Sequence, residues 1–270
     1  MKTIHVIIDP QNDFIDDATN SPSLAVSGAL KNMENIANVL RKDKVDEVLV
    51  TLDTHTVWDI AHTSWWKNSE GKEINPFTMI SSADIMSGKY VCSDPSMQEH
   101  SLNYTRALEA GGNYTHFVWP NHCIVGTKGH EVHNLVKEAI NEIAVPTNYL
   151  NKGMNVKTEH YSAFKAEVPV PEDKSTDIDI KSITHINSFD RIVFSGEAQS
   201  HCVRASVLDF LNNIPEHARS KVILLEDCMA SVPGFEAQGV EFINKAKDLG
   251  AVVMNSEEYL SLNRKPKARM

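Results

Sequence analysis

Apolar residues along this chain follow two spacings. Short β-branched runs predict buried strands, and we expect strands at residues 4–8, 45–52, 116–119, 191–195, 222–225 and 251–254. Longer stretches have apolar residues three and four positions apart, which is typical of amphipathic helices. They cover residues 29–40, 132–143, a segment that begins near 202, and 235–249. Strands that alternate with helices predict an α/β fold with a mostly parallel central sheet and helices on both faces.

Two segments interrupt this alternation. Residues 66–113 are long, have no clear period and contain Pro76 and the Gly111-Gly112 pair, so we expect a lid-like or partly helical insertion. Residues 168–179 are polar and proline-rich and predict a surface loop. We therefore expect one domain over residues 1–262, with 66–113 as its insertion, followed by a flexible basic tail at 263–270.

Composition narrows the class of protein. The 270 residues are 41% hydrophobic and 23% charged, with a formal net charge of -10. A net negative protein is not expected to bind nucleic acid or an anionic membrane. The apolar run at the start is too short for a signal peptide. The sequence contains no run of 18 consecutive apolar residues, so we expect no membrane span. The four cysteines are scattered, which is typical of a cytoplasmic protein with reduced thiols.

Polar side chains gather where predicted strands end. Asp9, Asp53, Trp119 and Gly196 lie at or just past such ends. Ligands of parallel sheets bind outside the carboxyl ends of the strands. We therefore expect a functional site at this edge.

Cys202 and Asp9 are the first candidates for chemistry. Cys202 lies where a strand turns into a helix, and the helix N-terminus there would lower the pKa of its thiol and favour a reactive thiolate. A buried apolar cysteine is the alternative. Asp9 follows an apolar strand, so it is either a desolvated proton acceptor or a loop cap. Asp13, four residues later, is expected to cap the loop.

Asp53 and His55 form the clearest metal-binding pattern. In a strand, residues two apart point to the same face, so a carboxylate and an imidazole can bind one ion there. His122 is the candidate for a third ligand. His62 is also near, but Trp65 and Trp66 beside it favour a packing role.

The chain resembles nicotinamidases of the isochorismatase-like hydrolase superfamily. The resemblance rests on five strings in order, spread over residues 4 to 254: IIDPQNDF, LVTLDTH, WPNHCIVGTKG, NKGMNVKTEHYSAF and GEAQSHCVRASVLDF. The resemblance implies an isochorismatase-like α/β fold. It also implies a cysteine amidohydrolase, which is a hydrolase that acts on a carbon–nitrogen bond, with a role in NAD salvage. Residues 66–113 have no counterpart in this pattern.

The resemblance also implies catalytic roles. Asp9, Lys152 and Cys202 correspond to the triad of the family, and Lys157 fits the spacing less well than Lys152. A cis peptide is expected before Ala198, aiming the amides of Ala198 and Cys202 at the oxyanion. Glu197 departs from the apolar residue expected at its position.

The remaining implied residues concern metal and substrate. Asp53, His55 and His122 would hold a divalent metal, zinc first, with manganese and iron as alternatives. Phe14 and Trp119 would stack on a pyridine ring, with Tyr161 lining the pocket. The expected reaction converts a small-molecule amide, nicotinamide, into nicotinic acid and ammonia through a Cys202 thioester.

Two other functions stay open. One is the hydrolysis of another carboxamide or carbamoyl group, and the other is a catalytically silent binding protein on the same fold. Family members are often oligomeric, so a homo-oligomer is also open.

Overall fold

The structure is a computed structural model and describes residues 1–112 and 114–262; the predicted tail at 263–270 lies outside them. Its centre is a six-stranded sheet with the order β10-β9-β8-β1-β2-β7, in which every neighbouring pair is parallel. The strands are β1 (Thr3–Ile8), β2 (Glu47–Asp53), β7 (Thr147–Lys152), β8 (Arg191–Gly196), β9 (Val222–Leu225) and β10 (Val252–Met254). The expected parallel α/β fold is confirmed.

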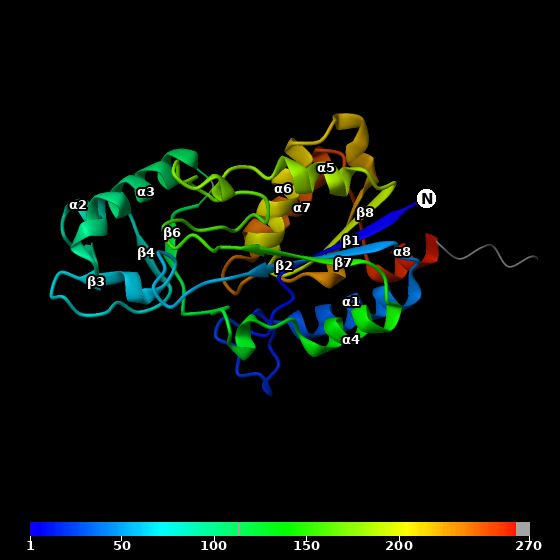
Figure 1. Ribbon diagram of the computed structural model, residues 1–270, viewed down its shortest axis with the longest axis horizontal. Coiled ribbons are helices and arrows are strands. Elements are labelled where there is room, and N and C mark those ends of the chain that lie inside the picture. Colours follow the sequence, from blue (N-terminus) through cyan, green and yellow to red (C-terminus); the bar gives the residue numbers. More distant parts are fainter. Residues whose placement is uncertain (113, 263–270) are drawn as a thin grey trace, which may run out of the picture.

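Helices cover both faces of this sheet (Figure 1). One face carries α1 (Ala29–Lys42), α4 (Asn134–Ile143) and α8 (Ser256–Leu262), and the other carries α5 (Ile180–Asn187), α6 (Arg204–Asn212) and α7 (Glu236–Asp248). In α1 the buried residues Met33, Ile36 and Leu40 are three and four positions apart. This spacing makes one apolar stripe that packs on the sheet. No helix in residues 1–112 or 114–262 is long and apolar enough to cross a bilayer.

Strand β1 lies in the middle of the sheet, between β8 and β2. All six of its residues are buried, which explains why they are apolar except for Thr3 and His5. Gly196, at the end of β8, has a φ of 117°, and a Cβ there would lie 2.0 Å from the carbonyl oxygen of Ile8. Only glycine allows β1 and β8 to approach this closely at their carboxyl ends.

Two strands differ from the sequence prediction. Strand β7 was not expected, because its polar sequence TNYLNK lies at the edge of the sheet and leaves Tyr149 exposed. Strand β6 (His116–Val118) forms where a strand was predicted, but it pairs antiparallel with β4 (Thr78–Ile80). The expectation that Trp119 follows a strand of the central sheet is therefore wrong. Trp119 follows β6, which belongs to the small sheet that β6 forms with β4 of the insertion.

The segment that had no clear period is folded. It contains the antiparallel pair β3 (Trp66–Asn68) and β5 (Tyr90–Cys92), with α2 (Ser82–Met86) and α3 (Gln98–Gly111). A second hydrophobic cluster, separate from the main core, joins them through Trp65, Trp66, Tyr104 and Leu108, among others. This unit lies past the carboxyl ends of the central strands (Figure 1).

Short helical turns connect these elements. They are the 3₁₀ turns η1 (Thr63–Trp65), η2 (Pro95–Met97), η3 (Lys128–His130), η4 (Lys174–Thr176), η6 (Glu216–Lys221) and η7 (Glu226–Cys228), and the π-helical turn η5 (Gln199–Val203).

Candidate active site

Four neighbouring strands end at one place. Asp9 directly follows β1, Asp53 ends β2, Lys152 ends β7, and Cys202 lies in the η5 turn that follows β8. Because parallel strands have their carboxyl ends at the same edge, these side chains meet although they are far apart in sequence. All four are buried.

Lys152 is the centre of this group. Its Nζ lies 3.0 Å from Asp9 Oδ2, 2.9 Å from Asp53 Oδ1 and 3.5 Å from Cys202 Sγ. It also donates to the carbonyl oxygen of His160 at 2.8 Å. Lys157, the alternative from the sequence, is exposed. The geometry therefore selects Lys152 as the lysine that contacts both the thiol and the Asp9 carboxylate.

The charges in this group are strongly coupled. Burial lowers the pKa of Lys152, but Asp53 and Asp9 together raise it well above its usual range. Burial raises the pKa of Asp53, yet His55 and Lys152 hold it well below normal. Burial also raises the pKa of Asp9, against the opposing effect of Lys152. A cationic Lys152 paired with an ionised Asp53 follows from these directions.

Cys202 differs from expectation in its protonation. Burial raises the pKa of its thiol well above the usual value, although Lys152 opposes this shift. Burial thus opposes the lowered thiol pKa that was expected at a helix N-terminus, since desolvation outweighs the neighbouring cation. The thiol must lose its proton to a neighbouring group when it reacts.

Backbone conformation at two positions explains how the side chains converge. Asp9 has a φ of 42°, and Thr51 accepts a hydrogen bond from the Asp9 amide at 2.9 Å while its hydroxyl donates to Asp9 Oδ1. Gly153 has a φ of 77°, and a Cβ there would lie 3.0 Å from Asp53 Oδ1. Glycine after Lys152 thus leaves room for the Asp53 carboxylate.

The expected cis peptide, between Glu197 and Ala198, directly precedes the turn that carries Cys202. The Val203 amide donates to the Ala198 carbonyl at 3.1 Å, a five-residue span that makes the turn wider than an α-helix. Glu197 Oε2 accepts a hydrogen bond from the Ala230 amide at 3.1 Å. Burial raises the pKa of Glu197 well above normal. A neutral carboxyl group thus occupies the position where an apolar residue was expected.

Three buried histidines gather beside Asp53. Candidate ligand atoms of His55, His62 and His122 lie within 4.8 Å of one another. The Nε2 atoms of His55 and His122 lie 3.1 and 3.3 Å from the Asp53 carboxylate oxygens. The structure brings together the predicted Asp53, His55 and His122 and adds His62, to which sequence reasoning gave a packing role. Its position seven residues after His55 was the available signal.

Each histidine is oriented through its Nδ1 atom. His55 Nδ1 lies 3.1 Å from Asp59 Oδ2, His62 Nδ1 3.2 Å from the Thr56 carbonyl, and His122 Nδ1 2.9 Å from the Pro120 carbonyl. Because carboxylate and carbonyl oxygens only accept, each Nδ1 would donate to its oxygen partner, and Nε2 would be the atom that binds an ion. His55 Nε2 is buried and makes no hydrogen bond with any residue in the described part of the chain, although Asp53 Oδ1 lies 3.1 Å from it. This donor set fits zinc.

An aromatic cavity lies next to Cys202. Phe14, Trp119 and Tyr161, the residues that the resemblance implied for substrate binding, line this cavity. The Trp119 indole donates to the Tyr161 hydroxyl at 3.0 Å. Glu159 and His201 line it as well, and sequence reasoning missed both. The volume is about 20 Å³, enough for a water molecule. An aromatic amide would enter only if the wall moved.

Asp13 has the structural role that was expected. Its Oδ2 accepts from the Cys123 amide at 2.7 Å, and its Oδ1 accepts from the amide and hydroxyl of Ser23. It thereby ties the loop after β1 to the loop that carries His122.

Solved structures share this fold, although the sequence matches no family model and no curated protein. A nicotinamidase/pyrazinamidase from Acinetobacter baumanii has a TM-score of 0.66 and 19% identity over 96% of this chain and 98% of that one. PnC1 from L. infantum in complex with nicotinate has a TM-score of 0.59 and 20% identity, covering 95% and 93%. A pyrazinamidase of Pyrococcus horikoshii in complex with zinc has a TM-score of 0.55 and 18% identity, covering 94% and 100%. The resemblance drawn from the sequence is confirmed at the level of the fold.

Proposed function

We propose that this chain is a cysteine amidohydrolase that deamidates nicotinamide to nicotinic acid and ammonia. The observation that carries the proposal is the buried Lys152, whose ammonium contacts the Cys202 thiol and the carboxylates of Asp9 and Asp53. Burying an ammonium costs desolvation energy, and buried charged groups with strongly shifted pKa values cluster at functional sites. The structures that share this fold bear the names nicotinamidase and pyrazinamidase, and one is a complex with nicotinate.

Substrate binding would use the aromatic cavity. Phe14 and Trp119 stack on the pyridine ring, and Tyr161 fixes the Trp119 indole through its hydroxyl. The carboxamide carbon then lies against Cys202, which lines the same cavity.

The chemistry would proceed in two steps. Asp9 accepts the thiol proton as Cys202 Sγ bonds to the carboxamide carbon, and the amides of Ala198 and Cys202 stabilise the oxyanion. Asp9 returns the proton to the departing nitrogen, so that ammonia leaves and a thioester forms. Asp9 then takes a proton from water, whose oxygen attacks the thioester carbon. The C–S bond breaks, nicotinic acid is released, and the thiol regains its proton.

The residues beside Asp53 would hold a divalent metal. We propose Asp53, His55 and His122 as ligands, with His62 as a fourth donor and zinc as the first candidate, ahead of manganese and iron. Such an ion supplies Lewis acidity and a fixed point for a substrate nitrogen or a water. Asp59 orients His55 for this role.

The insertion at 66–113 would act as a lid. Phe77, on this segment, is 54% exposed and has a φ of 64°, an unfavourable conformation for a side chain of this size. Its ring lies edge-on to Trp119 at 6.3 Å. A strained, exposed aromatic against the cavity wall is well placed to open and close the cavity.

The test is release of ammonia from nicotinamide by purified protein with added zinc. Cys202→Ala should abolish turnover, whereas Cys228→Ala, a buried cysteine outside the site, should retain it. Full activity in Cys202→Ala would refute the proposal. If wild-type protein binds metal and its Cys202 is alkylated, but only ureido or N-carbamoyl compounds are hydrolysed, the alternative amidohydrolase replaces nicotinamidase. Absence of turnover with every amide would favour the binding protein.

A further inference from the structure

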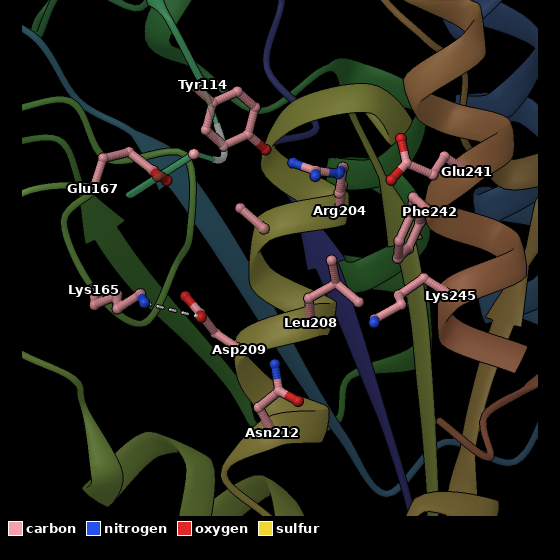
Figure 2. Close-up of a pocket in the computed structure, with 12 residues that line it drawn as sticks. Tyr114, Lys165, Glu167, Arg204, Leu208, Asp209, Asn212, Glu241, Phe242 and Lys245 are labelled. Atoms are coloured by element: carbon pink, nitrogen blue, oxygen red, sulfur yellow. Dashed lines mark ion pairs between the residues drawn. The ribbon is translucent and has the colours of Figure 1, made fainter. Parts of the chain in front are cut away.

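A second and larger cavity lies outside the candidate active site. It has a volume of about 450 Å³ and lies between α6, α7 and the segment around Lys165 and Glu167 (Figure 2). This volume is within the range of small-molecule sites. None of the residues that line it lines the cavity beside Cys202. The proposed amidohydrolase reaction leaves this cavity without a role.

Tyr114 forms the wall between the two cavities. Its ring lies 4.6 Å from the ring of Tyr161 and is stacked on His201 at 5.8 Å. Tyr161 and His201 both line the cavity beside Cys202. On the other side, the Arg204 guanidinium lies over the Tyr114 ring at 5.1 Å. A ligand that moves Arg204 or Tyr114 would therefore also displace Tyr161 and His201, because the Tyr114 ring contacts both.

The charges around the cavity favour an anion. Lys165 and Asp209 neutralise each other in an ion pair at 3.3 Å, drawn as a dashed line in Figure 2. Within residues 1–112 and 114–262, Arg204 and Lys245 make no ion pair, and Glu241 is the one further acidic side chain of the lining besides Glu167. Two cations against one carboxylate leave a local excess of one positive charge, in a chain whose net charge is -10.

Glu167 does not cancel this excess at neutral pH. Burial, with Asp209 nearby, raises its pKa to about 8. The charged groups that act on it are Asp209, Glu159, Lys165 and Arg204. A protonated Glu167 can donate a hydrogen bond into the cavity.

Apolar side chains also line the cavity, beside the polar Asn212. Leu208 from α6 and the buried Phe242 from α7 face the cavity, as Figure 2 shows. Guanidinium and ammonium groups bind carboxylates through charge-assisted hydrogen bonds. A ligand that binds both the cationic groups and the apolar side chains would carry one carboxylate on a compact apolar body.

We propose that this cavity is a second ligand site, in which Arg204 and Lys245 bind the carboxylate of a small organic monoanion and Leu208 and Phe242 contact its apolar body. Occupancy changes the cavity beside Cys202 through Tyr114. Inorganic phosphate, a compact dianion without an apolar part, is expected to bind more weakly.

Calorimetric titration with cyclohexanecarboxylate tests the site, with cyclohexylmethanol as the neutral counterpart and phosphate as the second anion. Arg204→Gln and Lys245→Gln should each weaken carboxylate binding by about tenfold, the loss expected for one charged hydrogen bond. Glu241→Gln should tighten it. Lys247→Gln, an exposed lysine on the same helix that does not line the cavity, is the matched control and should bind as wild type.

Three results would overturn the proposal. One is no binding to the wild-type protein, and another is equal binding of the neutral alcohol. The third is binding that disappears in Trp119→Ala and Phe14→Ala but persists in Lys245→Gln, since this places the ligand in the cavity beside Cys202. Lys245 is exposed, so its variant keeps the test decisive even if Arg204→Gln does not fold. The titration measures binding alone, so failure of the nicotinamidase proposal does not affect it.

Discussion

The ammonium nitrogen of Lys152 lies 2.9 Å from Oδ1 of Asp53, and this contact joins the proposed triad to the proposed metal ligands. The other Asp53 oxygen faces His122 at 3.3 Å. One carboxylate therefore stabilises the buried lysine and also faces the histidine cluster. Changes at either residue should affect both stability and chemistry, and the two effects can be separated.

Replacement of Lys152 by Met should lower stability and abolish turnover. Asp9 and Asp53 would remain buried without their cation, and loss of one partner of a buried ion pair costs about 3–5 kcal/mol. Urea denaturation and ammonia release measure the two effects. Asp53→Asn in the same chain should recover part of the stability but no activity. The exposed Lys157→Met is the control, and wild-type behaviour of Lys152→Met would contradict the assignment.

His62 should contribute to metal binding. Its Nδ1 is anchored to the Thr56 carbonyl, and its Nε2 lies 3.3 Å from His122 Nδ1. We expect about one zinc per wild-type chain by elemental analysis and markedly less in His55→Ala and His122→Ala. His62→Ala should lower zinc affinity about 10–100-fold, the range for groups that support a metal site. His217→Ala, at an exposed histidine, should change nothing; unchanged zinc affinity in His62→Ala would return this residue to a packing role.

Phe77 should control access to the active-site cavity. In Phe77→Ala the ring that lies against Trp119 is lost, while its exposure limits the loss of stability to about 1 kcal/mol or less. We expect a changed KM for nicotinamide and a melting temperature lowered by no more than about 2–4 °C. Met79→Ala, at a 60% exposed apolar residue two positions further on, is the matched control. Identical kinetics in Phe77→Ala and wild type would argue against a lid.

Glu167 should make stability depend on pH. Its folded-state pKa is raised to about 8 from 4.5, chiefly by burial, so the folded state holds a proton that the unfolded state releases. The stability that this proton provides is complete below about pH 4.5 and is lost as pH rises to about 8. The melting temperature of Glu167→Gln, measured against wild type from pH 5 to 9, should therefore rise relative to wild type with pH. The exposed Glu172→Gln should show no such trend, and a constant difference for Glu167→Gln would disprove the shift.

Protonation of Glu167 should also affect the second cavity. Above pH 8 its carboxylate would oppose Arg204 and Lys245, so binding of cyclohexanecarboxylate should weaken between pH 7 and 9. In Glu167→Gln the affinity should stay constant over this range. A wild-type affinity that is independent of pH would exclude Glu167 from the site.

The sequence by itself determined five of the six central strands, all except β7, and the positions of several site residues. Residues 4–8 and 191–195 are mostly apolar, with His5, Arg191 and Ser195 as the exceptions, because both faces of a central parallel strand are buried. Such runs are recognisable without a structure. Asp9, Asp53 and Cys202 were placed at the correct edge because each follows or ends one of these strands. Lys152 came from the family resemblance, since its strand β7 has no apolar run.

Only the tertiary structure decided which distant segments meet. Edge strand β7 is stabilised by one neighbour and a single covered face, so its sequence TNYLNK carries little periodic signal. Strand β6 was found from its residues, but its pairing with β4 depends on the second hydrophobic cluster. The histidine cluster and the charged cavity between α6 and α7 likewise depend on contacts across the chain. The local sequence encodes the spacing of apolar residues and which side chains are buried. Which strand or helix each element contacts follows from how whole elements pack together.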